Sequence, residues 1–165
     1  MDTTQRAKRP KTALAGPYGH PFHPVLVTVP IGAWVASVVF DIVALSADDK
    51  ESAFAEGAYW LIGIGIVGAV LAAVFGLMDL LTIPRGTRAF TTGITHMMLN
   101  LVAVVLFVVN FFVRAAADAD EATVLGFVLS LIALAILGAS GWLGGKLAYT
   151  YGVRVADETT QSKGF

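Results

Sequence analysis

Three histidines lie close to the ends of long apolar stretches in this chain. His20 and His23 belong to the sequence HPFHP at residues 20–24, and His96 lies just inside a later apolar stretch. A neutral imidazole is a common ligand of haem iron and of divalent metal ions. His23 and His96, on two different helices, are therefore candidate axial ligands of a b-type haem, because helix bundles hold cofactors between facing helices. His20 is the alternate ligand to His23.

Two further polar residues are candidates for the same site. Asp79 lies near the end of the second apolar stretch, and Asn100 follows His96 by one helical turn. Either side chain could orient a ring nitrogen of a ligating histidine from behind. Alternatively, His20, His23, Asp79 and His96 gather around a divalent metal such as non-haem iron or zinc. Proton handling is a third interpretation, since His and Asp inside membranes often form relays. The simplest alternative is that His20 and His23 only anchor a helix end at the membrane surface.

Four apolar stretches must position these residues. They cover residues 25–46, 57–83, 92–115 and 122–149, and each exceeds the roughly 20 residues that cross a hydrocarbon core about 30 Å thick. We therefore predict an all-α polytopic membrane protein, a bundle of four transmembrane helices within residues 20–152. Residues 1–19 and 153–165 are polar and are expected to be mobile tails. The length of the first stretch, with Pro30 and Asp41 inside it, argues against a cleaved signal peptide.

Composition excludes several classes of function. The chain is 56% hydrophobic and only 14% charged, with a net charge of −1, so a basic nucleic-acid surface is not expected. With 0 cysteines, disulfides, thiolate metal sites and covalently attached haem are excluded. The sequence also lacks a Ser/His/Asp nucleophile, a phosphate-binding glycine loop and an HExxH motif. We do not expect the chain to be an enzyme on its own.

Helical phase groups the polar residues in pairs. Eighteen residues make five full turns, so residues with that spacing share one face of a helix, about 27 Å apart. His23 and Asp41 have this spacing in the first stretch, and so do His96 and Arg114 in the third. Because these two helices run in the same direction, alignment in register places His23 near His96 and predicts an ion pair between Asp41 and Arg114. Two independent charges reaching the lipid headgroups are the alternative, and a kink at Pro30 would change the phase.

The second stretch carries a stripe of small residues that leads to Asp79: Gly65, Gly68, Ala72 and Gly76. Small residues allow helices to approach closely, and membrane helices associate largely through such packing. We therefore expect this stripe to face the interior of the bundle. Asp79 would then point toward the histidines.

Charge asymmetry predicts the orientation. Lys and Arg gather before the first helix, in the loop of residues 84–91, and near the end of the last helix. The other two loops are mainly acidic, with Asp48, Asp49, Glu51 and Glu56 in one and Asp118, Asp120 and Glu121 in the other. The positive-inside rule places both termini in the cytoplasm, and we expect the bacterial cytoplasmic (inner) membrane.

Several short sequences resemble a known family. They are HPFHP at residues 20–24, PIG at 30–32 with Asp41, GLMD at 76–79, Arg88 followed by His96, GG at 144–145 and YTYGV at 149–153. Over roughly residues 18–153, the chain resembles the bacterial domain-of-unknown-function family 2231 of small predicted membrane proteins. The resemblance implies a four-helix integral membrane domain and brings no established activity. Some relatives are joined to iron–sulfur redox domains, which implies a redox membrane complex as partner.

Three functions remain open at the level of the sequence. The first is a redox or electron-transfer subunit that holds a b-type haem or a metal between His23 and His96. The second is a non-catalytic accessory membrane subunit without a cofactor. The third is a small proton or ion transporter, although we find no substrate-binding repeat, broken helix pair or acidic relay through the membrane centre. The sequence does not predict an oligomeric state.

Overall fold

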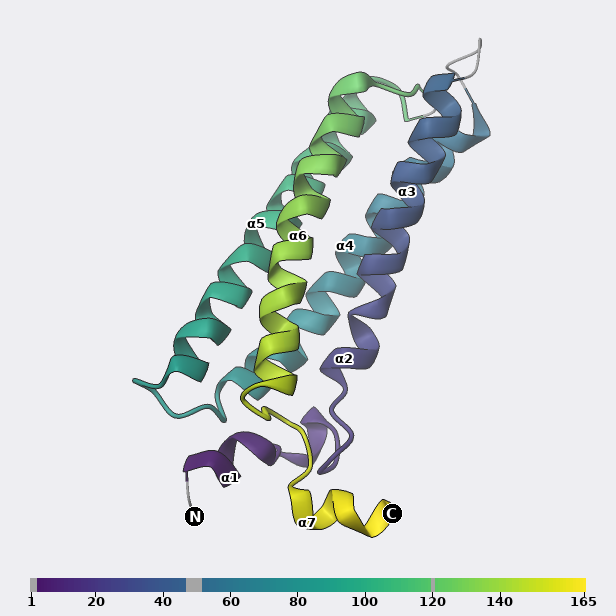
Figure 1. The fold of residues 1–165 in the computed structure, drawn as a ribbon. Coiled ribbons are helices and arrows are strands. Elements are labelled where there is room, and N and C mark those ends of the chain that lie inside the picture. Colours follow the sequence, from purple (N-terminus) through teal and green to yellow (C-terminus); the bar gives the residue numbers. More distant parts are fainter. Residues whose placement is uncertain (1–2, 47–51, 120) are drawn as a thin grey trace.

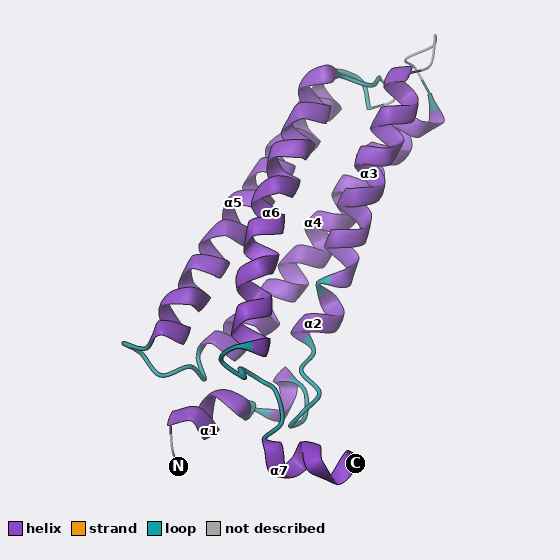
Figure 2. Cartoon of the chain, in the orientation of Figure 1, coloured by secondary structure: helices purple, strands orange, loops and turns teal. Residues whose placement is uncertain are grey.

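The computed structural model describes residues 3–46, 52–119 and 121–165, and its long elements are all helices (Figures 1 and 2). The first membrane span consists of α2 and α3, and the other three are single helices: α2 His23–Leu26, α3 Thr28–Ser46, α4 Ala53–Leu80, α5 Arg88–Ala116 and α6 Val124–Tyr149. All four spans are long and apolar enough to cross a membrane. The predicted all-α bundle of four helices is confirmed. The loop residues Asp48, Asp49, Glu51 and Asp120 lie outside the described residues.

Side-chain caps explain why two helices begin earlier than the apolar stretches predict. The Ser52 hydroxyl accepts a hydrogen bond from the backbone N–H of Ala55 at 3.3 Å, so α4 begins at Ala53 instead of residue 57. The Thr87 hydroxyl accepts from the N–H of Phe90 at 3.1 Å, and α5 begins at Arg88 instead of residue 92. A polar cap satisfies one of the free N–H groups of the first turn. Hydropathy alone does not detect this extra turn.

The first membrane span is interrupted at Val27, between α2 and α3. The cause is Pro30, because a proline ring collides with the carbonyl of the residue four positions earlier, which here is Leu26. The interruption is short: the N–H of Ile31 already bonds to the carbonyl of Val27 at 3.2 Å. The chain therefore continues in the same direction, and His23 keeps its place on the inner side of the bundle.

The helices form two antiparallel hairpins, α3 with α4 and α5 with α6, which pack side by side (Figure 1). Each helix packs against two neighbours, so α3 and α5 lie diagonally across the bundle and meet through side chains at its centre. The rings of Trp34 and Phe107 stack there with centroids 4.0 Å apart and an angle of 11° between their planes. A Cβ at Gly65 would collide with Trp34, so this glycine makes room for the indole.

Side chains are distributed as a lipid environment requires. Large apolar residues are exposed along the outside of every span, among them Val39, Val67, Leu71, Leu101, Val105 and Leu131. Several polar side chains of the spans are fully buried: Ser37, Asp41, Asn110, Arg114, Ser130 and Ser140. Lipid solvates apolar groups, whereas unpaired polar groups in hydrocarbon are costly. The chain is therefore a multi-pass membrane protein.

The two terminal segments pack against each other beneath the helix ends. The backbone N–H of Arg154 bonds to the carbonyl of Ala7 at 2.9 Å, and the N–H of Asp157 bonds to the Tyr18 hydroxyl at 2.8 Å. The segments contain the short helices α1 Thr3–Lys8, η1 Ala13–Ala15, α7 Glu158–Gln161 and η2 Ser162–Gly164. Asp157 caps α7, and hydrogen bonding with Thr160 lowers the pKa of its carboxyl.

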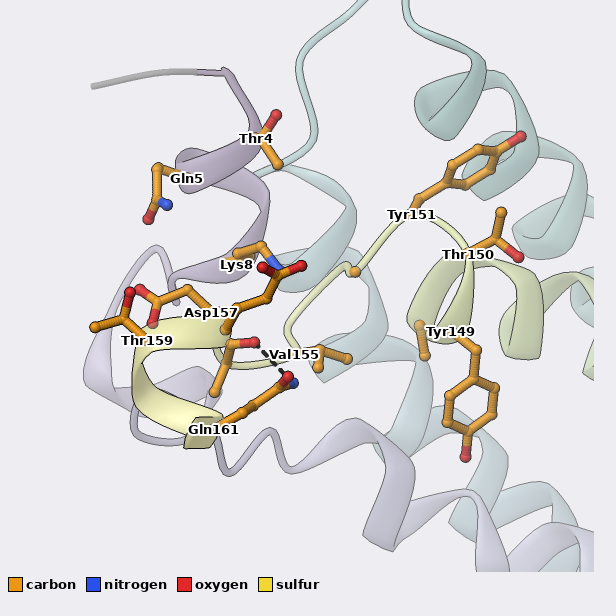
Figure 3. A pocket seen from close by; sticks show the side chains of 14 residues that line it. Thr4, Gln5, Lys8, Tyr149, Thr150, Tyr151, Val155, Asp157, Thr159 and Gln161 are labelled. Atoms are coloured by element: carbon orange, nitrogen blue, oxygen red, sulfur yellow. Dashed lines mark hydrogen bonds between the residues drawn. The ribbon is translucent and has the colours of Figure 1, made fainter. Parts of the chain in front are cut away.

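An open hollow of about 680 Å³ lies between these terminal segments and the end of α6 (Figure 3). Its walls come from α1, the last residues of α6 and α7, with Lys8, Tyr151 and Asp157 among them. Gln161 reaches across one wall to the carbonyl of Ala156 at 3.0 Å. Neither His23 nor His96 lines this hollow.

Candidate functional site: two histidines at one end of the bundle

The His23 side chain is held against α4. Its Nδ1 lies 2.9 Å from the carbonyl oxygen of Ala72. A carbonyl can only accept, so Nδ1 carries the proton and donates, and a neutral ring has its lone pair on Nε2. The ring lies over Gly76, where a Cβ would come within 2.9 Å of its Cε1. The position of the ring thus depends on a carbonyl and on a glycine one turn further along α4.

His96 is held against α6 in the same way. Its Nδ1 lies 2.8 Å from the carbonyl oxygen of Ser140, and a Cβ at Gly144 would come within 3.1 Å of its Cε1. The Ser140 hydroxyl adds a contact of 3.0 Å with Nδ1 and donates to the His96 carbonyl. The Asn100 amide donates to Nε2 at 3.1 Å and to the His96 carbonyl at 3.0 Å.

The two rings face each other across the centre of the bundle, with centroids 6.3 Å apart and planes at 89°. Each ring donates Nδ1–H to a backbone carbonyl and lies on a glycine four residues further along the same helix. A hydrogen bond from Nδ1 to a carbonyl fixes the tautomer and the orientation of a histidine. The pair therefore consists of two oriented imidazoles at the same depth, which we call the histidine end.

This equivalence extends along the whole bundle and reveals an internal repeat. Residues of α2 and α3 correspond to residues of α5 at a spacing of 73: His23 and His96, Trp34 and Phe107, Ser37 and Asn110, Asp41 and Arg114. Residues of α4 correspond to residues of α6 at a spacing of 68: Ala58 and Gly126, Ile62 and Ser130, Gly65 and Ala133, Ala72 and Ser140, Gly76 and Gly144. The hairpins are thus related by an approximate two-fold axis along the bundle. The repeated element is a pattern of contacts with few identical residues.

At the other end of the axis lies a buried ion pair, which we call the ion-pair end. Arg114 donates from Nη1 and Nη2 to the two carboxylate oxygens of Asp41, at 2.8 and 2.7 Å. Its Nε donates to Asn110 at 3.1 Å, and Asn110 donates to the Ser130 hydroxyl at 2.8 Å and to the Gly126 carbonyl at 2.9 Å. Arg114 and Asp41 are each only 1% exposed. The structure thus brings together the two charges whose shared helical phase predicts a pair, and they do not reach the headgroups separately.

Two candidate residues lie away from the histidine pair. Asp79 does not stand behind a histidine, because its Oδ1 contacts Arg154 Nε at 2.7 Å. This correction arises because the terminal segment brings a buried arginine to the end of α4. His20 is exposed in the loop before α2. Within residues 3–46, 52–119 and 121–165, no group of three or more His, Asp or Glu could hold a metal ion. Among the described residues, His20, His23, Asp79 and His96 do not come together as one group.

Two residues at this end could not be identified from the sequence. Arg154 has the sequence context of an ordinary basic residue after the last helix, although its side chain is buried. Ser140 has no charge and no motif around it. The available signal for Ser140 is its spacing of 68 residues from Ala72, which becomes visible when His23 and His96 are treated as equivalent positions.

These features define a class: an all-helical, multi-pass membrane protein whose core is a repeated helical hairpin. The chain belongs to the family described as "Predicted membrane protein (DUF2231)", whose model matches residues 19–157. No curated protein and no solved structure matches the sequence.

Proposed function

We propose that the chain holds a b-type haem between His23 and His96 and serves as a redox or electron-transfer subunit of a membrane complex. The observation that carries this proposal is the equivalent support of the two imidazoles, each with Nδ1–H on a backbone carbonyl and its ring on a glycine. This support leaves Nε2 as the nitrogen that would bind iron. At His96 the Asn100 amide, which now bonds to Nε2 at 3.1 Å, would have to release that nitrogen.

The number of ligands favours haem over a bare metal ion. Zinc and non-haem iron need three or more protein ligands, and the described part of the chain offers no such group. A b-type haem would need only two ligands from the protein, which His23 and His96 would supply. The two candidate ligands lie close together, with ring centroids 6.3 Å apart. When bound, haem supplies one-electron chemistry.

An absorbance spectrum of the protein purified from cells supplied with haem tests the proposal. We expect a Soret band that shifts on reduction with dithionite. His23→Ala and His96→Ala should each lower the bound haem at least tenfold, while His20→Ala, a matched control at an exposed histidine, should leave it unchanged. A colourless wild-type protein, or equal haem content in all variants, would overturn the proposal.

We further propose that both termini lie in the cytoplasm and that the membrane is the bacterial inner membrane. The asymmetry of basic and acidic loops supports this orientation, and it puts the histidine end on the cytoplasmic side. Protease added to intact cells should spare tags at either terminus and cleave a tag inserted at Asp49. Cleavage of both terminal tags would reverse the orientation.

An accessory membrane subunit without cofactor is the second candidate. The closed hydrogen-bond network of Asp41, Asn110 and Arg114 favours it, because that network holds helices together and needs no ligand. A protein that lacks haem and metal but co-purifies in fixed ratio with a redox complex would support this candidate over the first.

A further inference from the structure

The two histidines differ in how their own helices hold them. His96 lies inside α5, which begins eight residues earlier at Arg88 with the Thr87 hydroxyl as cap. His23 is the first residue of α2, and the preceding residue, Phe22, provides no side-chain cap. The backbone at His23 is therefore fixed by the loop before it, residues 16–22, and not by a preceding helical turn.

That loop is attached through the carbonyl of Ala15. The backbone N–H of Phe22 bonds to this carbonyl at 3.3 Å. Gly16 makes the return possible, because its φ of 93° is left-handed and a Cβ there would collide with the carbonyl of His20. The carbonyl of Ala15 thus lies one hydrogen bond away from the residue that precedes His23.

Arg154 holds the same carbonyl from the other side. Its Nη2 donates to the carbonyl of Ala15 at 2.9 Å and to that of Gly16 at 3.2 Å. Its Nε lies 2.7 Å from Asp79 Oδ1 without the alignment of a hydrogen bond. The residue is only 4% exposed and has a φ of 60°, a conformation that costs free energy in a residue other than glycine.

Asp79 completes the connection to the site. It lies three residues beyond Gly76, on the turn of α4 that supports the His23 ring. One guanidinium therefore joins the loop that leads into His23 to the helix on which His23 rests. At the equivalent place in the second hairpin, 68 residues after Asp79, stands the apolar Leu147. We call Arg154 with Asp79 and the Ala15 carbonyl the clamp. Among the described residues, only the hairpin whose histidine begins its helix has it.

We propose that Arg154 is the positioning residue of His23, fixing its backbone through the Ala15 and Gly16 carbonyls and Asp79. The inference rests on the proposed haem site for its role, while its structural part concerns the loop alone. The geometry implies that loss of the guanidinium frees His23 and leaves His96, which has its own helix and its own partners, in place.

The first experiment reads the ligation of haem in Arg154→Gln, with Arg85→Gln as a control at an exposed arginine on the same end of the bundle. We expect Arg154→Gln to retain haem on His96 and to lose His23 as ligand. Its spectrum should change from six-coordinate low-spin to five-coordinate high-spin, and added imidazole should restore the six-coordinate form. Wild-type ligation in Arg154→Gln would overturn the inference.

The second experiment needs no haem. Hydrogen exchange of the full-length protein in detergent should be at least tenfold faster at the amides of Phe22 and Val27 in Arg154→Gln, and unchanged at Phe90 at the start of α5. Arg154→Lys keeps the positive charge but loses the several N–H donors of the guanidinium, so it should accelerate exchange at the same amides less. It replaces Arg154→Gln in the experiment if that variant does not fold. Unchanged exchange at Phe22, or equal acceleration at Phe90, would overturn the inference. A wild-type protein without haem, but with this exchange pattern, would refute the haem site and leave the clamp intact.

Discussion

The two ends of the same diagonal helix pair handle polar groups in opposite ways. At the ion-pair end, both oxygens of Asp41 and three nitrogens of Arg114 bond within the chain. At the histidine end, both Nδ1 atoms are engaged, yet within the described residues His23 Nε2 makes no hydrogen bond. A saturated buried network stabilises and needs nothing more. An oriented imidazole with a free nitrogen retains the capacity to bind, and for this reason we propose the histidine end as the functional site.

At each end of the bundle, two side chains at equivalent positions of the repeat meet. Two histidines occupy these positions at the histidine end, and an aspartate and an arginine occupy them at the ion-pair end. Like charges at the second pair would repel each other in a buried place. The buried charges therefore favour the association of two hairpins that differ, one with Asp41 and the other with Arg114. The histidines, in contrast, are the same residue in both hairpins.

The largest effect is expected from Arg114→Ala, which leaves the Asp41 carboxylate buried without a partner. Removal of one member of a buried ion pair typically costs about 3–5 kcal/mol of the free energy of unfolding. Asp41→Ala should have a similar effect, and the double variant should lose less than the sum of both. Unfolding in detergent measures all three. Additive losses would show that the two charges act independently.

The double variant Asp41→Arg with Arg114→Asp exchanges the two charges between the hairpins. The repeat predicts that charge pairing is restored but stability only in part. An arginine at position 41 would face Ser37 and Ala58 where the native one has Asn110 and Gly126. The native guanidinium needs the glycine at 126, because a Cβ added there would come within 2.9 Å of Arg114 Nη2. Ala58, at the equivalent position of the first hairpin, has such a Cβ. Full recovery of stability would mean that the surrounding residues contribute little.

The sequence contains the information for the four spans and for the pairing of both ends. Apolar length predicts the helices, and the eighteen-residue spacings predict which side chains share a depth. The partner of Asp79 could not be predicted, because Arg154 reaches it only after the chain turns back beneath the bundle. The supporting carbonyls of Ala72 and Ser140 are backbone groups, so no residue type in the sequence indicates them. The repeat is difficult to detect because most equivalent positions hold different residues.

A smaller and local effect is expected from Gly76→Ala and Gly144→Ala, which place a Cβ against the rings of His23 and His96. Overpacking of this kind typically costs about 1–3 kcal/mol. Gly138→Ala is the matched control, because a Cβ at that position of α6 has no atom within 4 Å. Both test variants should lose haem affinity, whereas the control should keep it. If the control loses as much, the glycines matter for the helices and not for the rings.

The smallest effect is expected from Ser140→Ala, which makes the second hairpin resemble the first at the position of Ala72. The variant loses the hydroxyl contacts with His96, each at 3.0 Å, but keeps the carbonyl that accepts from Nδ1. One lost hydrogen bond typically costs about 1 kcal/mol. Ser37→Ala is the control, because that buried hydroxyl bonds only to the Trp34 carbonyl of its own helix, and its removal should be close to neutral. Since His23 is oriented without such a hydroxyl, Ser140→Ala should keep its haem ligation. Loss of haem with a stable fold would show that the second half of the site depends on a side chain that the first half does not need.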